Sequence, residues 1–395
     1  MISNLFIEAS CKQIYCNGER VCGDVFHTVN VKEEGRRIIV LSDGMGHGVK
    51  ANILGILTAT MAARFTVEHK ETSQIAETIL NTLPIDSEKK TSFSTFTVVD
   101  IEADGKTTIL EYENPQCLVL RGDKVFQPQW NCLMLNTKKN VGREILCCTF
   151  QAQQDDRIIM FSDGVTQAGM GSKALPLGWG TEAVHQFILA QVTKNMEIDA
   201  SQLGNEVVNC ALRYDGFESK DDISCAVVYF RKPRKILVCT GPPVDMDLDK
   251  DMARIFEEFD GKKVICGGST SELIFRELKI DTSKLIEEED PHNPPFYLLP
   301  GIEIITEGVV TLNAVYNTLN KMSLQNEGTI KGAVGILANL LIESDDIKFL
   351  VGTKINQAHQ SPDVPIDLEM RRTVVHRIAR VLEQKYLKTV EMTFM

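Results

Sequence analysis

Short apolar runs alternate with amphipathic segments through the first 230 residues of the chain. Alternating or β-branched runs predict strands at 5–13, 25–31, 37–41, 94–101, 107–112, 117–121, 124–126, 144–150, 157–161 and 223–230. Apolar positions that recur near every 3.6 residues predict helices at 49–65, 72–83, 180–192 and 199–214. Many strands with two early and two late helices indicate an α+β sandwich, with sheets inside and helices outside.

The first of these helices combines a helical period with small side chains. Apolar residues recur near every 3.6 residues: Ala51, Ile53, Leu54, Leu57, Met61 and Phe65. Ala59, Ala62 and Ala63 are the small residues. The same segment contains no proline, so the helix can pack closely against its neighbours.

A basic joint that contains proline, residues 231–235, predicts a boundary between a domain at 1–232 and a second at 235–395. Beyond the joint, the pattern predicts strands at 235–239, 263–266 and 347–351. It predicts helices at 250–259, 272–278, 309–322, 332–342 and 367–388, the last with Asp367 as its N-cap. Strands that alternate with helices indicate a small parallel α/β domain.

The composition limits the classes of partner. The chain has 395 residues and a formal net charge of −12, which argues against a nucleic-acid binder that works by neutralising phosphates. No uncharged stretch approaches the ~20 apolar residues of a membrane span. The N-terminal residues show neither the basic start nor the apolar core of a signal peptide, so we expect a cytoplasmic protein. The eleven cysteines form no Cys-x-x-Cys pair, which favours reduced, mostly buried thiols over a zinc site.

Acidic residues stand where several of the predicted strands begin or end. Asp43 and Asp163 each lie in a Ser-Asp-Gly sequence after four apolar residues, Asp24 follows Gly23, and Asp221 and Asp222 open the run 223–230. A single Asp-Gly is most often a turn, but the repeated pattern favours carboxylates that converge on one cleft. Carboxylates without nearby His or Cys suit magnesium or manganese, and a pair of such ions suits hydrolysis of a phosphate ester.

The order of these motifs resembles the metal-dependent PPM (PP2C-like) serine/threonine phosphatases, and most closely the bacterial sporulation-stage-II-E (SpoIIE) branch. The motifs are Gly23-Asp24, Asp43-Gly44-Met45-Gly46-His47-Gly48, Phe161-Ser162-Asp163-Gly164-Val165 and Asp221-Asp222-Ile223-Ser224. The resemblance implies a PP2C-like β-sandwich flanked by helices, two Mn²⁺ or Mg²⁺ ions, and hydrolysis of phosphoserine or phosphothreonine by activated water. It covers about the first 230 residues.

The resemblance also implies a role for each acid. Asp43 would bridge the two metals, and the backbone carbonyl of Gly44 together with Asp24 would bind one of them. Asp163 and Asp221 would bind the other.

Three further positions take their implied roles from relatives. Asp222 stands where many relatives carry Asn, and it would share or exchange the role of Asp221. Arg20 is the candidate phosphate-binding arginine, although it could equally be an ordinary surface residue. Many relatives carry a His where this chain has Met45, which leaves the proton donor open between His47 and a metal-bound water.

Other functions and partners remain open at this point. A catalytically silent phosphoprotein-binding regulator and a small-molecule phosphohydrolase are the alternatives to a protein phosphatase. By resemblance, the substrate would be a phosphorylated protein of the anti-anti-sigma-factor type, and a homodimer is one open oligomeric state. In the second domain, the turn from Gly267 to Ser271 is either a site for a small anionic ligand or a tight strand-to-helix turn capped by Ser or Thr.

Overall fold

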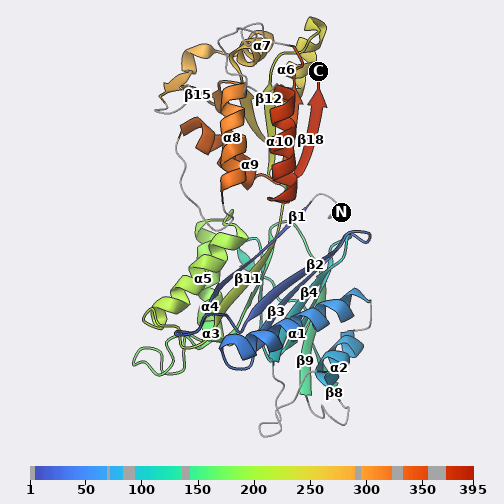
Figure 1. Ribbon diagram of the computed structural model, residues 1–395. Coiled ribbons are helices and arrows are strands. Elements are labelled where there is room, and N and C mark those ends of the chain that lie inside the picture. The colour runs from blue at the N-terminus through green and yellow to red at the C-terminus, as the bar shows by residue number, and fades with distance from the viewer. Residues whose placement is uncertain are drawn as a thin grey trace. The chain divides into compact units, whose positions relative to one another are not determined.

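The computed structural model describes residues 5–68, 72–82, 94–135, 143–289, 295–322, 332–354 and 371–395. The chain divides into two compact units, Met1–Lys232 and Pro233–Met395 (Figure 1). Among the described residues, no helix has both the length and the apolar character needed to cross a membrane. All eleven cysteines are free, and most of them are buried or half-buried.

Two antiparallel sheets form the centre of the first unit. One has five strands in the order β1 (Phe6–Ile14), β11 (Ile223–Arg231), β10 (Asp156–Phe161), β6 (Leu118–Arg121) and β7 (Lys124–Val125). The other has six, in the order β2 (Val25–Val31), β3 (Arg36–Gly44), β4 (Ser94–Ile101), β5 (Lys106–Tyr112), β9 (Arg143–Gln151) and β8 (Asn131–Leu135). The edge strand β8 has no clear alternation in its sequence and was not predicted.

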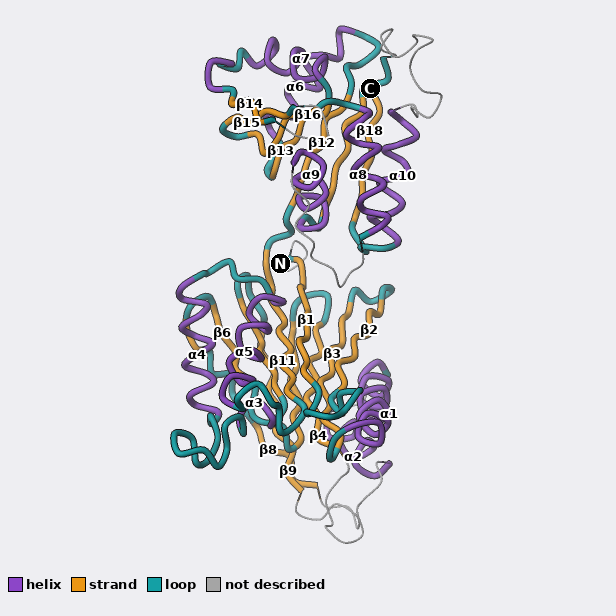
Figure 2. The backbone as a smooth tube through the Cα atoms, turned by 60° about the vertical axis from the view of Figure 1, so that its left-hand side comes forward, coloured by secondary structure: helices purple, strands orange, loops and turns teal. Residues whose placement is uncertain are grey.

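Helices cover the outer faces of both sheets, as Figure 2 shows. Helices α1 (Gly48–Val67) and α2 (Thr72–Thr82) share a core with the six-stranded sheet. Helices α4 (Thr181–Lys194) and α5 (Ala200–Tyr214), with the short α3 (Asp163–Thr166), share a core with the five-stranded sheet. A third apolar cluster fills the space between the sheets. The predicted α+β sandwich with helices outside is therefore confirmed.

Helix α1 packs closely through its small residues, as predicted. Ile53 and Leu57 are 60% and 43% exposed, whereas small residues face the sheet: Gly48, Ala51, Gly55, Thr58, Ala59, Ala62, Ala63 and Thr66. The reason is the closeness of the packing. A Cβ atom on Gly55 would lie 2.7 Å from the carbonyl oxygen of Gly23, so only small side chains fit there.

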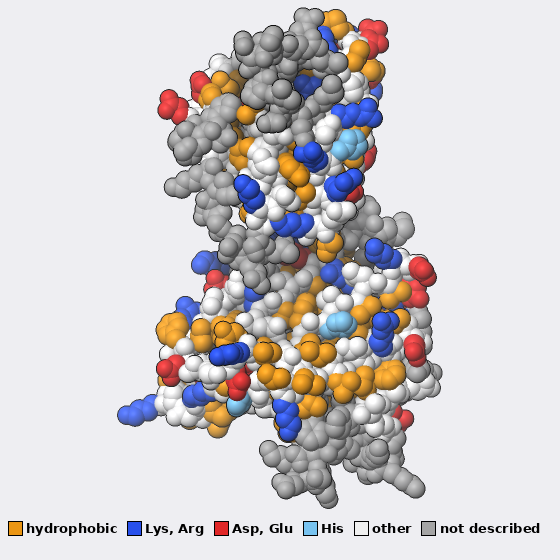
Figure 3. Space-filling view, in the orientation of Figure 1, with side chains coloured by type: hydrophobic (Ala, Val, Ile, Leu, Met, Phe, Trp, Pro, Cys, Tyr) orange, Lys and Arg blue, Asp and Glu red, His pale blue; other side chains and the backbone are white. Residues whose placement is uncertain are grey.

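The outer face of α1 instead carries an apolar stripe, which we define as Val49, Ile53, Ile56 and Leu57. These four side chains are all exposed and lie at helical spacing. Figure 3 shows hydrophobic side chains gathered across this side of the first unit. Both faces of α1 are thus apolar, which explains why periodicity alone could not distinguish the inner face from the outer one.

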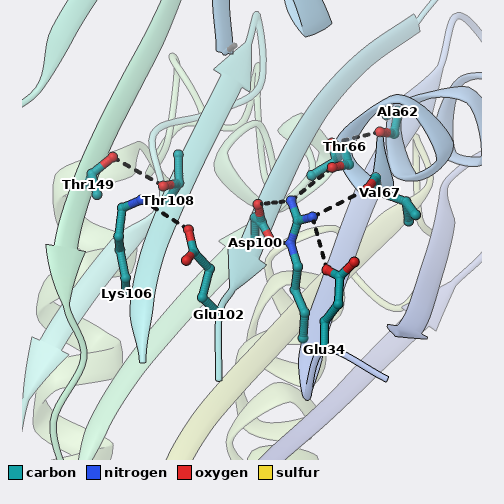
Figure 4. Close-up of polar contacts among 10 residues, drawn as sticks. Glu34, Ala62, Thr66, Val67, Asp100, Glu102, Lys106, Thr108 and Thr149 are labelled. Atoms are coloured by element: carbon teal, nitrogen blue, oxygen red, sulfur yellow. Dashed lines mark hydrogen bonds and ion pairs between the residues drawn. The ribbon is translucent and has the colours of Figure 1, made fainter. Parts of the chain in front are cut away.

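Arg36 anchors the end of α1 to the six-stranded sheet (Figure 4). Its guanidinium donates to the carbonyl oxygen of Thr66 at 2.8 Å and makes a two-point contact with Asp100, at 2.7 and 2.6 Å. The last carbonyl groups of a helix have no partner within the helix, and here a buried arginine supplies one. The side-chain hydroxyl of Thr66 donates in turn to Ala62, one turn earlier.

The second unit contains one seven-stranded sheet, in which five neighbouring strands are parallel. The strand order is β14 (Ile286–Glu288), β15 (Phe296–Leu299), β16 (Ile302–Thr306), β13 (Lys262–Cys266), β12 (Lys235–Thr240), β17 (Asp346–Val351) and β18 (Thr389–Phe394). One face packs on α6 (Asp249–Glu258) and α7 (Gly268–Leu278). The other packs on α8 (Val309–Lys321), α9 (Gly332–Glu343) and α10 (Arg371–Gln384).

Several elements of this unit differ from the sequence-based expectation. Strands β14, β15, β16 and β18 were not predicted. The expected helix 367–388 is described as α10 from Arg371 and ends at Gln384, and Asp367 lies outside the described residues. The chain turns after Gln384 because it must return to pair β18 with β17 in parallel.

The contacts of Arg36 predict a large loss of stability when its side chain is removed. Arg36→Met leaves the Asp100 carboxylate and the end of α1 without their partner. It should lower the free energy of unfolding of the first unit by about 3 kcal/mol in urea denaturation. Arg64→Met, on an exposed position of the same helix, should change it by less than about 0.5 kcal/mol. Equal losses in the two variants would contradict the anchoring role.

Candidate metal centre

Strand pairing brings the predicted acids to matching strand ends. In the six-stranded sheet, Val25 of β2 pairs with Ser42 of β3, and the two strands are antiparallel. Asp24, just before Val25, therefore lies next to Asp43, just after Ser42. In the five-stranded sheet, Phe161 pairs with Cys225, so Asp163 follows β10 close to Asp221, which precedes β11. Each sheet therefore contributes acids from two neighbouring strand ends.

The carboxylates of the two sheets lie close enough to perturb one another. Burial raises the pKa of Asp43 well above its usual range, and the charges of Asp24, Asp163 and Asp221 raise it further. Burial also raises the pKa of Asp163. The effects of Asp24, Asp163 and Asp221 on Asp43 place the carboxylates of the two sheets near one another.

Asp24 and Asp221 show the same effect. Burial raises the pKa of Asp24 to about 7, and hydrogen bonds from Ser224 and Ser162 offset part of the shift. Burial raises the pKa of Asp221 to about 6. Asp24 is almost completely buried, and its Oδ2 atom has no hydrogen-bond partner. An unsatisfied buried carboxylate oxygen beside three other acids fits a divalent cation, which would supply the missing partner and relieve the repulsion.

The donor set is made entirely of oxygen atoms, as Mg²⁺ or Mn²⁺ prefers. No three His, Cys, Asp or Glu side chains in the described part of the chain already have the spacing to hold one ion. A bound cation must therefore draw these carboxylates together. Asp163 has a further contact that would have to adapt, because Gln167 Nε2 donates to its Oδ2 atom at 2.7 Å.

Asp222 differs from the other acids because both of its oxygen atoms accept backbone hydrogen bonds. Oδ1 accepts from the N–H of Cys16 at 3.0 Å, and Oδ2 accepts from the N–H of Gly23 at 2.8 Å. The buried side chain thereby fastens the loop between β1 and β2, which ends in Asp24. This contact could not be predicted from the sequence, because the two partners lie about two hundred residues away along the chain.

The glycines that follow two of the acids are explained by close backbone packing. A Cβ atom on Gly44 would lie 2.1 Å from the carbonyl oxygen of Ala51 in α1. A Cβ atom on Gly164 would lie 2.2 Å from the carbonyl oxygen of Asp222. In both Ser-Asp-Gly sequences the glycine allows the backbone beside the acid to pack directly against a neighbouring element. This packing requires a glycine at position 44 whether or not its carbonyl binds a metal.

Two serines and a glutamine join the sheet ends beneath the acids. The hydroxyl of Ser162 accepts from the N–H of Ser224 at 3.0 Å, and the Ser162 N–H donates to the Ser224 carbonyl at 3.1 Å. Gln13 Nε2 donates to both Ser224 Oγ at 3.0 Å and the Asp24 carbonyl at 3.1 Å, which links the two sheets. The sequence pattern around Ser162 does not predict this structural role.

Arg20 and His47 are both exposed. Arg20 is exposed in the loop between β1 and β2, and it has no acidic partner among the described residues. His47 is 55% exposed and its Nδ1 atom lies 2.8 Å from Glu19 Oε1. The contact joins the start of α1 to the same loop. Asn52 of α1 adds a second link by donating to the Cys22 carbonyl at 2.7 Å.

Comparison with known families identifies a match over half of the chain. The sequence model described as stage II sporulation protein E (SpoIIE) matches residues 33–231, which include Asp43, Asp163 and Asp221 but begin after Asp24. No curated protein matches the chain in sequence.

Solved structures show more distant similarity. The SpoIIE phosphatase domain of Bacillus subtilis, in a crystal form without domain swapping, is 18% identical with a TM-score of 0.44 over 58% of this chain and 94% of that one. The PP2C phosphatase domain of SpoIIE from the same organism with a fragment of its regulatory domain is 18% identical, with a TM-score of 0.47 over 58% and 63%. The RsbU and RsbW domains of a Mycobacterium tuberculosis protein are 14% identical, with a TM-score of 0.45 over 64% and 67%.

The raised pKa values predict that the metal-free chain loses stability as pH rises. In the unfolded chain these carboxyls titrate near pH 4. Above that pH the folded form therefore retains protons that the unfolded form has lost. The contribution of these carboxyls to stability in EDTA should be largest below about pH 4 and be lost as pH rises through 6 and 7, the pKa values of Asp221 and Asp24.

Asp43→Asn provides the matched comparison. At pH 8 in EDTA this variant should be more stable than wild type by at least about 1 kcal/mol, because one buried charge is gone. Its urea midpoint should also vary less with pH. Adding Mn²⁺ should stabilise wild type and not the variant. A variant less stable than wild type in EDTA at pH 8 would contradict the repulsion.

Proposed function

The chain belongs to the stage II sporulation protein E (SpoIIE) family of PP2C-like phosphatases, and we propose that it is an active, metal-dependent protein serine/threonine phosphatase. The observation that carries the proposal is the convergence of four mutually repelling carboxylates from the ends of both sheets. Such an arrangement destabilises the metal-free protein and is of use only when cations bind to it.

In this proposal Asp24, Asp43 and the Gly44 carbonyl hold one divalent cation, and Asp163 and Asp221 hold a second, with Asp43 shared. Two bound Mg²⁺ or Mn²⁺ ions would supply a nucleophilic water at neutral pH and charge neutralisation for the phosphate oxygens. The residues of the chain supply the negative charge and hold the acids at neighbouring strand ends.

Asp222 acts as a positioning residue in this scheme. Its two hydrogen bonds to Cys16 and Gly23 hold the loop that carries Asp24, and Gly164 packs on its backbone. It therefore connects Asp24 from one sheet with Asp163 and Asp221 from the other. We expect its carboxylate to hold these backbone contacts in the metal-bound protein as well.

Arg20 is proposed to bind the substrate phosphate. It is exposed on the loop that ends in Asp24 and forms no ion pair with an acid in the described part of the chain. Its guanidinium can therefore donate hydrogen bonds to a phosphate. The substrate that this site would serve is a phosphoserine or phosphothreonine in a bacterial signalling protein, of the anti-anti-sigma-factor type by family resemblance.

Hydrolysis of a phosphoserine peptide should require Mn²⁺ or Mg²⁺ and stop in EDTA. Asp43→Asn and Asp163→Asn should each lower kcat by at least about a hundredfold, because a metal ligand worth several kcal/mol of transition-state stabilisation is weakened. Asp123→Asn, an equal charge change at an exposed turn, should stay within twofold. Activity that survives EDTA, or survives both substitutions, would disprove the two-metal assignment. A folded wild type that binds Mn²⁺ without any turnover would instead indicate a phosphoprotein-binding regulator.

Arg20→Met should raise KM for a phosphoserine peptide by about tenfold, the value of one charge-assisted hydrogen bond, while metal affinity stays unchanged. Arg64→Met, at an exposed position of α1, is the control and should leave both quantities unchanged. The measurement is steady-state kinetics at several Mn²⁺ concentrations. Unchanged KM and kcat in Arg20→Met would make Arg20 an ordinary surface residue.

A further inference from the structure

The parallel strands of the second unit have a reversal of order at their centre. Of these parallel strands, β12 comes first along the chain. It pairs with the second, β13, on one side and with the fourth, β17, on the other. In open parallel sheets such a reversal leaves a crevice at the carboxyl ends of the two strands, and ligands bind there. In this chain those ends are Thr240 and Val351, which pair with each other.

Hydrogen bonds donated by backbone N–H groups hold four strand ends together at this point. The N–H of Gly241, after β12, donates to Thr270 Oγ1 in the first turn of α7 at 2.7 Å. The N–H of Gly352, after β17, donates to the Thr240 carbonyl at 2.9 Å, and the N–H of Gly267, after β13, donates to the Thr306 carbonyl of β16 at 2.8 Å. The start of α7 is therefore fixed beside the end of β12.

Arg371, at the start of α10, places a positive charge at the same point. Its guanidinium lies so close to Gly241 that a Cβ atom there would be 2.1 Å from Nη1. Nη1 donates to the carbonyl groups of Gly352 and Lys354, at 3.1 and 3.2 Å. The Nε atom is buried without a hydrogen-bond partner. Burial lowers the pKa of Arg371, and the negative charge of Glu307 offsets part of this shift. The Glu307 carboxylate itself accepts from N–H groups at the start of α8, so Arg371 does not use all of its donors.

The two helices that start here differ in how their first N–H groups are satisfied. The carboxylate of Glu307 accepts from the N–H of Val310 at 3.0 Å and so fills the N-terminus of α8. Helix α7 begins after Gly267, which has no side chain to cap it, and a Cβ atom on Gly268 would meet only open space. Nearby, Thr240 is fully buried and its hydroxyl has no partner.

We propose that the second unit binds the phosphate group of a small phosphorylated molecule between Arg371 and the first turn of α7. A dianionic phosphate would receive the free N–H groups of the helix start and the unpartnered Nε of Arg371, and its oxygen atoms could accept from the Thr240 hydroxyl. The site is independent of the carboxylate cluster in the first unit. It lies at the turn from Gly267 to Ser271, where the sequence left a ligand site and a plain turn open.

Isothermal titration calorimetry of the full chain in EDTA tests this site. Without divalent cations, the carboxylate cluster of the first unit repels phosphate, so binding there does not interfere. The probes are inorganic phosphate, AMP and a phosphoserine peptide. Wild type should bind inorganic phosphate and AMP in a saturable manner. Arg371→Met should weaken both by at least about tenfold, and Arg380→Met, an equal charge change at an exposed position of α10, should have no effect.

Gly268→Asp separates loss of the site from loss of the fold. A carboxylate in the first turn of α7 should leave the thermal unfolding temperature of the second unit unchanged or raise it. The reason is that a negative charge near a helix N-terminus interacts favourably with the helix dipole. The same charge should abolish binding of phosphate and AMP. The proposal is overturned if neither probe binds wild type, if only the phosphoserine peptide binds, or if Gly268→Asp and Arg371→Met bind as wild type does.

Discussion

The repulsion among buried carboxylates is the constraint around which the first unit is built. Strand pairing within each sheet, and the apolar core between the sheets, place Asp24 and Asp43 close to Asp163 and Asp221. Strand pairing and the apolar core stabilise the fold by more than the repulsion among the acids destabilises it, so the fold tolerates this repulsion. The metal-free first unit thereby keeps a strongly negative cluster at some loss of stability, as is common where function needs charge.

Helix α1 is coupled to this site through small-residue packing. Ala51 lies against both Gly44 and Gly23, and Gly55 lies against Gly23, so the helix touches the strand end that carries Asp43 and the loop that carries Asp24. Arg36 fixes the other end of the helix to the sheet. Because neither glycine contact has spare room, α1 cannot shift without moving both acids. The exposed apolar stripe lies on the opposite face of the same rigid helix.

The sequence predicted the structure well where chemically distinctive residues stood at the ends of segments with a clear apolar pattern. The acids could be found because each stands at the boundary of an apolar strand, and strands of one sheet end together. The small residues of α1 indicated close packing, but the glycines of other elements that require it could not be identified from periodicity. The role of Asp222 and the reversal of strand order at β12 also depend on pairings between distant segments, which periodicity does not report.

The two units present charge of opposite sign at their candidate phosphate sites, and this determines how each could meet a phosphate group. In the first unit a phosphate is repelled until cations intervene, so recognition there depends on metal and disappears with a chelator. In the second unit the positive charge is Arg371 itself, fixed by the carbonyl groups of Gly352 and Lys354, so recognition needs no metal. A chain with both arrangements can respond to phosphate chemistry in two separable ways, because removing divalent ions silences one site and leaves the other intact.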